Sequence, residues 1–451
     1  MRSTTSGRPG AIRDRCGPPH PGPVHAGPVH AGPVHAGPVH AGPATGPDRT
    51  AGQARAAGGR YAEAVVDLAA VAHNTALLAA HTRGALMAVV KADGFGHGAV
   101  PVARTALAHG ASWLGVTSTT EALALRAAGI TAPVLSWMHL PDEDFTPALL
   151  AGIDLAVSSP LHLAGIAACA ARAGTPARVH LKVDTGLRRN GAAPGDWPAL
   201  TAHARALELR GLLTVRGVWS HLADPDGPGR ATDRQVAEFE QAVAVARAAG
   251  LRPALLHLAN SAAGLTDPRT HFDLVRAGLG LYGVEPVPGR AFGLRPAMTL
   301  RARAIMARPV VAGQGVSYGH EYTAERAGTL LLVPLGYADG VPRAAAGRAR
   351  MWVAGARRPV AGRIAMDQCV VDAGSLPVRI GEDVLVFGPG DRGEPTVADW
   401  ARWAGTNPHE VLTGIGARVP RRYLPAPGRA VPAGAAPHPQ TPTDPEDHPR
   451  D

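Results

Sequence analysis

Two lysines stand out among the residues that can do chemistry. The chain contains 45 lysine and arginine residues, and only Lys91 and Lys182 are lysines. Arginine supplies positive charge to a surface equally well, but its pKa above about 12 keeps it protonated, so it cannot act as a nucleophile. A lysine amine can do so once burial or neighbouring charges lower its pKa. Lys91 and Lys182 are therefore the first candidates for catalysis.

Each of these lysines follows a predicted buried strand. Lys91 comes after the apolar run 85–90 and is followed by a glycine-rich segment, 92–98. Lys182 stands in a similar place, at the end of the run 177–181. An α/β barrel presents its catalytic residues in this way, at the end of a strand and before the next helix. Neither spacing is typical of a metal site or of a nucleic-acid-binding motif, and we predict no metal.

Short apolar runs alternate with helical patterns from residue 61 to residue 296. Eight strand-and-helix units of this kind predict an α/β fold, a (β/α)8 barrel of the TIM type. An open, doubly wound sheet is the alternative, but no Gly-x-Gly-x-x-Gly follows an early strand, as a dinucleotide site would require. The predicted strands are 85–90, 113–116, 134–136, 154–157, 178–181, 213–219, 255–258 and 274–276.

The pattern changes after residue 296. Alternating apolar and polar residues and turns rich in glycine and proline predict a mainly β C-terminal domain over 297–424. Its predicted strands lie at 298–305, 329–333, 351–353, 360–364 and 383–387.

The two ends of the chain have a different composition. Residues 1–60 carry a Pro- and His-containing repeat of five residues, and residues 425–451 form a Pro-rich polar tail. Both segments lack the large apolar groups of a packed core, so we predict disorder. Metal binding by the regularly spaced histidines is a second interpretation, which a simple repeat makes unnecessary.

The charge and cysteine content exclude several classes of function. The net charge is +9, but five of these charges lie in the first sixty residues. The remainder shows no basic stripe interleaved with aromatics, so we expect no nucleic-acid partner. The three cysteines have no redox or metal spacing, and no apolar span reaches the roughly 18 residues of a membrane helix. We therefore predict a cytoplasmic protein with no membrane partner.

Eight motifs in order over residues 62–424 resemble those of alanine racemases, which are pyridoxal-phosphate enzymes of fold type III. One such motif alone would be weak evidence, whereas eight in the same order are specific. The motifs are Ala88–Gly98, Leu181–Gly186, Ser220-His221, Ala259–Ala263, Val275-Arg276, Gly315–Gly319, Gly336–Gly340 and Met366–Gln368.

The resemblance implies four catalytic residues. A racemase removes the Cα proton on one face and returns a proton on the other, and pyridoxal phosphate stabilises the carbanion between these steps. Lys91 matches the residue that binds the cofactor covalently and acts as base on the D-isomer face. Tyr318 matches the base for the L-isomer, and His221 matches its hydrogen-bond partner. Arg276 matches the partner of the pyridine nitrogen, which it keeps unprotonated.

The resemblance also implies cofactor contacts at the phosphate end. Phe95 and Ala417 stand where relatives carry hydroxyl groups, which puts the strength of cofactor retention in doubt. The matching phosphate positions are Asn260, Ser261 and the backbone N–H groups of Gly278 and Leu279.

Two further positions match contacts to the substrate carboxylate, the side chain of Arg189 and the backbone N–H of Met366. Lys182 matches a lysine that is often carbamylated, which would give an anion able to hold Arg189. A surface pair of Lys182 with an acidic neighbour is the simpler reading. Tyr337 and Asp367 resemble residues at the entrance of the site.

In this family the second domain of one subunit completes the barrel of the other. The resemblance therefore implies a homodimer that interconverts L- and D-alanine and supplies D-alanine for peptidoglycan. Alternatives are a serine or broad-specificity racemase, a decarboxylase, which would carry a carboxylate in place of Arg276, and a non-catalytic pyridoxal-phosphate-binding protein, which would lack the second domain.

Overall fold

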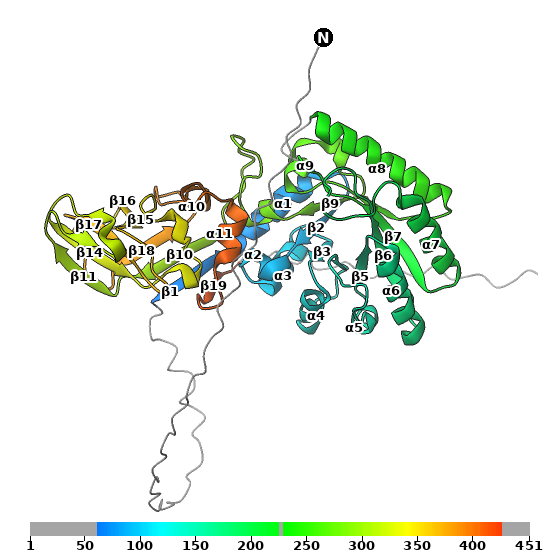
Figure 1. The fold of residues 1–451 in the computed structure, drawn as a ribbon, viewed down its shortest axis with the longest axis horizontal. Coiled ribbons are helices and arrows are strands. Elements are labelled where there is room, and N and C mark those ends of the chain that lie inside the picture. Colours follow the sequence, from blue (N-terminus) through cyan, green and yellow to red (C-terminus); the bar gives the residue numbers. More distant parts are fainter. Residues whose placement is uncertain (1–60, 225–228, 426–451) are drawn as a thin grey trace, which may run out of the picture. The chain divides into compact units, whose positions relative to one another are not determined.

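The computed structural model describes residues 61–224 and 229–425 (Figure 1). The predictions of disorder for residues 1–60 and for the tail beyond Pro425 lie outside these residues. No helix in the described ranges is long and apolar enough to cross a membrane.

Eight parallel strands form a nearly closed barrel, which confirms the predicted fold class. The strand order is β8-β7-β6-β5-β4-β3-β2-β9. Backbone bonds from Asp273 N to Leu256 O, 3.0 Å, and from Arg276 N to Ala259 O, 3.1 Å, join β8 to β9. The strands are β2 (Ala85–Val89), β3 (Trp113–Val116), β4 (Val134–Ser136), β5 (Asp154–Val157), β6 (Ala177–Lys182), β7 (Leu213–Trp219), β8 (Leu255–His257) and β9 (Leu274–Ala277).

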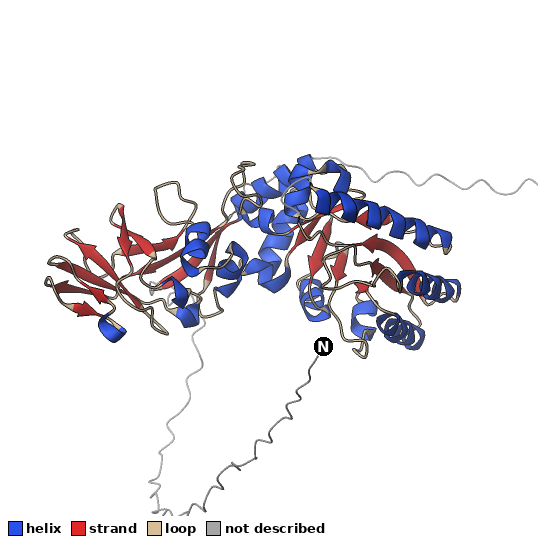
Figure 2. Cartoon of the chain, turned by 45° about the horizontal axis from the view of Figure 1, so that its top comes forward, coloured by secondary structure: helices blue, strands red, loops and turns tan. Residues whose placement is uncertain are grey.

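Helices surround the strands of the barrel (Figure 2). Local signals set where these helices begin. Asp67 accepts hydrogen bonds from the first N–H groups of α1, and Ser118 with Glu121 forms a capping box on α4. The helices are α1 (Leu68–His81), α3 (Ala99–Ala108), α4 (Thr119–Ala127), α5 (Thr146–Leu150), α6 (Pro160–Ala173), α7 (Trp197–Leu209), α8 (Arg230–Ala248) and α9 (Ser261–Thr266), with the 3-10 turns η2 (Pro268–Thr270) and η3 (Leu279–Tyr282).

Alternation along each strand divides the barrel side chains between two layers. On β6, Val179 and Leu181 belong to the apolar core between strands and helices, and the alternate residue His180 is buried outside this core. A smaller apolar cluster also lies apart from that core. It consists of Met87, Trp113, Leu135, Ala156, Trp219 and Leu274. The barrel is therefore packed rather than hollow.

The second domain is mainly β. It contains a six-stranded sheet, β16-β15-β18-β10-β1-β19, a three-stranded sheet, β11-β14-β17, and the pair β12-β13. Its elements are β10 (Met298–Arg303), β11 (Met306–Val310), β12 (Gly315–Val316), η4 (Tyr318–His320), β13 (Tyr322–Thr323), β14 (Gly328–Val333), η5 (Tyr337–Asp339), η6 (Arg343–Ala345), β15 (Arg350–Val353), β16 (Ala356–Pro359), β17 (Cys369–Gly374), β18 (Asp383–Phe387), α10 (Val397–Ala404), α11 (Pro408–Gly414) and β19 (Arg421–Leu424).

One predicted strand of this domain is not formed. In the segment 360–364, Val360 makes only an isolated bridge to Val371. Gly362 has φ +76°, and a Cβ at this position would lie 2.6 Å from the carbonyl oxygen of Val316. The chain turns at this glycine and packs closely on the neighbouring segment, so the strand pattern does not continue.

The first described strand belongs to the second domain. The segment β1 (Ala62–Asp67) pairs with β10 antiparallel and with β19 parallel. The sequence assigned residues 61–67 to the barrel, and the structure places them in the six-stranded sheet. Their small apolar side chains, such as Ala62 and Ala64, fill the core of that sheet. Alternation along one strand shows that it is buried but does not reveal its partner.

Candidate active site

The segment that carries Lys91 has an unusual backbone. It is called α2 (Lys91–Phe95), but Ala92, Asp93 and Phe95 have φ between 50 and 53° and Gly94 has φ 62°. Each non-glycine residue in this left-handed conformation costs about 1–2 kcal/mol. The surroundings must offset this cost, and the position of Lys91 is correspondingly well determined.

Several hydrogen bonds hold this left-handed turn, including three that join it to the end of β2, to Glu121 and to the start of α3. Gly94 N donates to Val90 O at 2.8 Å, which ties the turn to the end of β2. Ala92 N donates to Glu121 Oε1 at 2.7 Å, and Ala99 N donates to Asp93 Oδ1 at 2.8 Å. The sequence predicted a glycine-rich turn here, but not its handedness.

Lys91 lies half-buried between two aromatic rings. Its Nζ is 6.0 Å from the ring centroid of Phe95 and 5.9 Å from that of Trp137. Burial and the positive charge of Arg189 lower the pKa of Lys91, and the carboxylate of Glu121 opposes this shift. A lowered pKa increases the neutral fraction of the amine, which is the form that attacks a carbonyl carbon.

Arg276, on β9, is buried at the centre of a set of hydrogen-bond acceptors. Burial lowers its pKa to about 9. Within the described residues, Nη1 and Nη2 of Arg276 donate its hydrogen bonds, and no carboxylate forms an ion pair with the guanidinium. The acceptors are the carbonyl oxygens of Ser220, 2.8 Å, His257, 3.0 Å, and Leu258, 3.0 Å, with Nδ1 of His257, 3.1 Å, and Nδ1 of His221, 3.2 Å.

His221 is held in one tautomer by Arg276. The guanidinium can only donate, so Nδ1 of His221 accepts and its proton is on Nε2. Burial and the cations Arg276, Arg189, Lys182 and Lys91 lower the pKa of His221 to about 3. The imidazole is therefore neutral at physiological pH and offers an N–H donor from Nε2.

Lys182, at the end of β6, is buried beside Trp219. Its Nζ is 4.5 Å from the Trp219 ring centroid. Burial, with the positive charges of Arg276 and Arg189, lowers the pKa of Lys182 to about 8. Asp184 opposes the shift, but its carboxylate accepts hydrogen bonds from backbone N–H groups. The interpretation of Lys182 and its acidic neighbour Asp184 as a surface ion pair therefore does not hold. Lys182 is a buried amine that is partly neutral near pH 8.

The four residues expected at the phosphate end come together, with Ser261 at their centre. Ser261 Oγ accepts from Gly278 N at 2.9 Å and from Gly280 N at 3.3 Å, and Asn260 Oδ1 caps α9 by accepting from Ala263 N at 3.1 Å. The Ser261 hydroxyl keeps its own hydrogen to donate, and it has no recorded acceptor among the described residues. A phosphate oxygen would supply one.

All of these groups line one cavity of about 670 Å³. This volume suits a cofactor with a small substrate. Four cations line it, and no carboxylate of the described chain does, so the charge favours an anionic ligand with phosphate and carboxylate groups. The predicted residues that line it are Lys91, Lys182, Arg189, His221, Asn260, Ser261, Arg276, Gly278 and Leu279.

Sequence reasoning missed several other residues of this cavity, among them two tryptophans and two residues of the second domain. Trp137 and Trp219 lie at the ends of β4 and β7, a position that favours site residues in barrels and could have revealed them. Asn407 and His409 come from the beginning of α11 in the second domain, where we find no such signal. The His409 ring centroid is 5.8 Å from that of Phe95.

Phe95 stands where relatives carry a hydroxyl group, and its ring packs on that of Tyr282. Its ring stacks on Tyr282 with centroids 4.7 Å apart, and the Tyr282 hydroxyl donates to Val89 O at 2.9 Å. A Cβ on Gly278 would lie 3.3 Å from the Phe95 ring. Tyr282 therefore stabilises the wall of the cavity, while its hydroxyl is already used within the protein.

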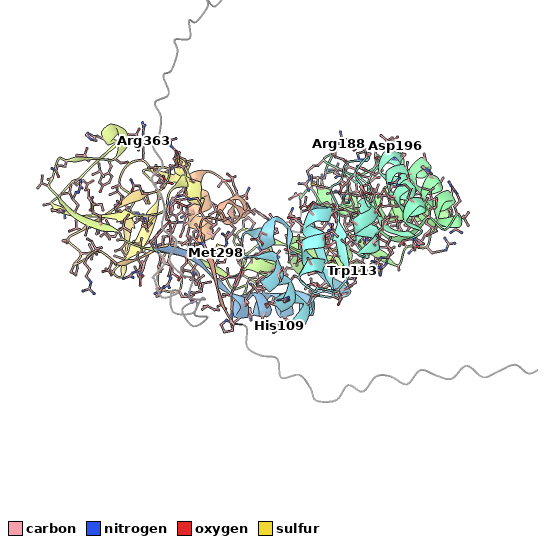
Figure 3. The ribbon with its side chains drawn as sticks, turned by 90° about the horizontal axis from the view of Figure 1, so that it is seen from below. His109, Trp113, Arg188, Asp196, Met298 and Arg363 are labelled. Carbon is pink, nitrogen blue, oxygen red and sulfur yellow. The ribbon has the colours of Figure 1, made fainter. Side chains whose placement is uncertain are left out.

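Tyr318 and Met366 are not brought to this cavity within one chain. The side chain of Tyr318 is 68% exposed and that of Met366 is 53% exposed. Tyr318 lines a separate hollow of about 270 Å³ in the second domain, together with Arg363 and Gln368 (Figure 3 labels Arg363).

Tyr337 and Asp367 lie on the same part of the second domain. Tyr337 N donates to Ala365 O at 3.0 Å, and the Tyr337 side chain is 42% exposed. Asp367 pairs with Arg418 at 2.7 Å, next to Ala417. The second domain thus presents the remaining predicted residues on an exposed surface.

No group of three or more His, Cys, Asp or Glu side chains in the described ranges is placed to hold a metal ion.

The sequence and the fold are both similar to those of known proteins. Residues 66–286 match the family model for the N-terminal domain of alanine racemase, and residues 297–423 match the model for its C-terminal domain. The alanine racemase of Frankia casuarinae is 54% identical over 80% of this chain and 96% of its own length. That of Thermobifida fusca is 53% identical over 80% of this chain and 98% of its own.

A crystal structure of the alanine racemase from D-cycloserine-producing Streptomyces lavendulae has the same fold. It aligns with a TM-score of 0.80 and 48% identity, over 82% of this chain and 98% of that one.

Proposed function

Because the chain belongs to the alanine racemase family of isomerases, we propose that it interconverts L- and D-alanine with pyridoxal phosphate bound at the mouth of its barrel. The observation that carries this proposal is the cavity that unites Lys91, His221 and Arg276 with the Ser261 hydroxyl and two further cations. We further propose that two subunits complete each site, because Tyr318 and Met366 lie exposed on the second domain.

The residues fit the cofactor at both of its ends. The Ser261 hydroxyl, with Asn260 and Leu279 beside it, would bind the phosphate, and Arg276 would face the ring nitrogen. Bound in this way, pyridoxal phosphate withdraws electrons from the Cα–H bond of an attached amino acid. Lys91 would hold the cofactor covalently through its amine.

Lys91 and Tyr318 would move the proton at Cα. The lowered pKa of Lys91 favours a neutral amine, which can accept this proton on one face. The phenol of Tyr318 from the second subunit would exchange a proton on the opposite face. His221 would support this role. Its Nε2–H could donate a hydrogen bond to the Tyr318 oxygen after the phenol has lost its proton.

Arg276 would limit the reaction to proton transfer. Its terminal nitrogens are held by five acceptors, and a guanidinium does not give up its proton readily even with its pKa lowered to about 9. A ring nitrogen placed opposite Arg276 would be offered a hydrogen bond but no proton. The bound cofactor would then delocalise charge at Cα less, which would disfavour reactions other than return of the proton.

Arg189 and the backbone N–H of Met366 would hold the substrate carboxylate. Arg189 is exposed in one chain, so it needs a fixed partner to keep its orientation. A carbamate on Lys182 would be that partner. The neutral amine attacks carbon dioxide and loses one proton, and the product is an anion where a cation stood. The lowered pKa of Lys182, about 8, supplies the neutral amine.

The wider roles follow from this activity. We propose that the protein works as a cytoplasmic homodimer and that its D-alanine enters peptidoglycan, and we expect no membrane or nucleic-acid partner.

Isotope exchange tests the activity and the substrate range together. The purified protein, supplied with pyridoxal phosphate in deuterated water, should introduce deuterium at Cα of L-alanine and yield D-alanine. L-serine and L-lysine, assayed in parallel, separate a strict alanine racemase from a broad-specificity enzyme. Absence of exchange with every substrate, despite a cofactor that borohydride fixes to the Lys91 peptide, would instead indicate a non-catalytic cofactor-binding protein.

A further inference from the structure

A line of four buried polar side chains crosses the barrel interior, on strands β9, β8, β6 and β5. Arg276 Nη1 is 3.1 Å from His257 Nδ1, His257 Nε2 is 2.9 Å from His180 Nδ1, and His180 Nε2 is 3.2 Å from Asp154 Oδ2. Asp154, His180 and His257 are fully buried, and Arg276 is 4% exposed. Polar groups are rarely retained in such a place unless every one of them is hydrogen-bonded.

The two ends of this line fix every hydrogen in it. A guanidinium only donates, so His257 Nδ1 is an acceptor and its proton is on Nε2. That proton is donated to His180 Nδ1, which leaves the proton of His180 on Nε2, facing a carboxylate that only accepts. If His180 turned its Nδ1–H toward His257, the Nδ1 of His257 would carry a proton and face the guanidinium. One donor direction, from Arg276 to Asp154, is therefore consistent with the geometry.

The packing around the line leaves room for this arrangement. Gly217, on β7, is paired with His180, and a Cβ there would lie 2.3 Å from His180 Nδ1. Glycine at this point allows the imidazole to turn toward His257. Trp113, labelled in Figure 3, covers the His180 ring edge to face at 5.6 Å. Trp219 stacks on His257 at 5.5 Å.

Arg276 is a buried cation without a carboxylate partner in the described ranges, and Asp154 is the carboxylate to which this line connects it. Within the described chain Arg276 is bound by neutral acceptors alone. Three of these acceptors are backbone carbonyl oxygens, whereas His257 Nδ1 accepts only while the proton of this imidazole is on Nε2. The carboxylate of Asp154 keeps the proton of His180 on Nε2. His180 Nδ1 then remains an acceptor, which keeps the proton of His257 on Nε2.

We propose that Asp154 and His180 are positioning residues for Arg276, which they act on through His257 from the opposite side of the barrel. This inference rests on the proposed function for its catalytic consequence, since Arg276 would face the ring nitrogen of the cofactor. Asp154 and His180 touch neither cofactor nor substrate in this proposal. Their role is to keep His257 Nδ1 as an acceptor, so that the guanidinium keeps this side-chain contact in addition to its three carbonyl acceptors.

The hydrogen positions test the proposal independently of activity. In a neutron structure of the holoenzyme, we expect deuterium on Nε2 of both His180 and His257 and none on either Nδ1. Deuterium on Nδ1 of either imidazole would overturn the proposal. This result holds even if the protein acts on a substrate other than alanine, so it is separate from the success of the proposed function.

Substitutions at Asp154 test the consequence for catalysis. Asp154→Leu removes the acceptor at similar volume, and we expect kcat to fall roughly 10- to 100-fold with KM for alanine changed less than about 2-fold. Asp154→Asn keeps a carbonyl oxygen that can accept from His180 Nε2, and its loss should be at least about 5-fold smaller. Equal losses in the two variants, or a loss in KM alone, would contradict the proposal.

Two rim arginines provide matched controls. Arg178 Nε lies 2.8 Å from Asp154 Oδ1, and Arg216 Nη1 lies 3.2 Å from Oδ2. Both contact the same carboxylate from outside the line. Arg178→Met and Arg216→Met should leave kcat within about 2-fold of the parent enzyme, because the bond from His180 remains. If either reproduced the Asp154→Leu loss, the effect would arise from the rim and the proposal would fail. Should Asp154→Leu not fold, the hydrogen positions decide the question alone.

Discussion

The barrel mouth and the exposed surface of the second domain carry the two halves of one predicted site, and they are organised differently. At the barrel mouth, Arg276 has five hydrogen bonds and the pKa values of Lys91, Lys182 and His221 are all lowered. On the second domain, Tyr318 and Met366 are exposed. One chain thus brings the predicted residues of the barrel mouth together, and in the proposed dimer a second subunit would bury the exposed residues of the second domain.

The largest effect is expected when subunits that lack Lys91 are mixed with subunits that lack Tyr318, which tests whether the two halves come from different chains. Lys91→Arg and Tyr318→Phe should each lower racemisation roughly 10³-fold, because each removes one of two proton-transfer groups. Mixed subunits should recover about a quarter of the parent activity, since half of the dimers are mixed and each contains one intact pair. Turnover of L-alanine in mixtures that have exchanged subunits is the measurement.

The control for mixing is a chain that carries both substitutions. It should restore no activity to either single variant, because it provides neither intact half. If Lys91→Arg and Tyr318→Phe mixtures also stay inactive although heterodimers form, the tyrosine acts within its own chain or not at all. Cofactor content should remain unchanged in Tyr318→Phe, which separates loss of a base from loss of binding.

A smaller effect is expected inside the barrel half. Lys182→Arg keeps a positive charge, but it cannot form a carbamate, so Arg189 loses its proposed anionic partner. We expect KM for alanine to rise roughly 10-fold with kcat changed only a few-fold. Steady-state kinetics in buffers with and without bicarbonate are the measurement. The parent enzyme should lose affinity when carbon dioxide is removed, whereas the variant should not respond.

The smallest effect concerns stability at acidic pH. The pKa of His221 is about 3 in the folded protein and 6.5 in its ordinary state, so between these values the unfolded chain binds more protons. Stability is then fully present above pH 6.5 and is lost as the pH falls toward 3. Urea unfolding of the cofactor-free protein should show His221→Asn losing less stability than the parent over this window. Parallel pH profiles would mean that His221 is protonated freely in the folded state.

The barrel strands and the two lysines could be predicted from local patterns, whereas the other site residues were predicted from the family resemblance. Apolar runs bounded by turns gave β2 to β9, and the scarcity of lysine singled out Lys91 and Lys182. The left-handed turn after Lys91 could not be predicted, because Ala92 and Asp93 adopt φ near 50° only under tertiary contacts such as the bond to Glu121.

Contacts between residues that are distant along the chain could not be predicted from the sequence either. The chain gives no local sign that β1 pairs with β10 and β19, nor that His180 and His257 meet inside the barrel. Asn407 and His409 reach the cavity from a helix of the second domain for the same reason. Patterns within one element predict its type and its buried face, whereas contacts between distant elements depend on how the whole chain packs.

The place of β1 has a consequence for how the protein is made on the ribosome. This strand is synthesised before the whole barrel, yet its neighbours in the sheet are β10, which follows the barrel, and β19, which ends at Leu424. A nascent chain must therefore carry an unpaired apolar strand through the synthesis of residues 68–297 before β10 is available, and of residues 68–420 before β19 is available. Unpaired strands promote aggregation. The yield of folded protein should accordingly depend on chaperones that cover the nascent N-terminal region until translation is complete.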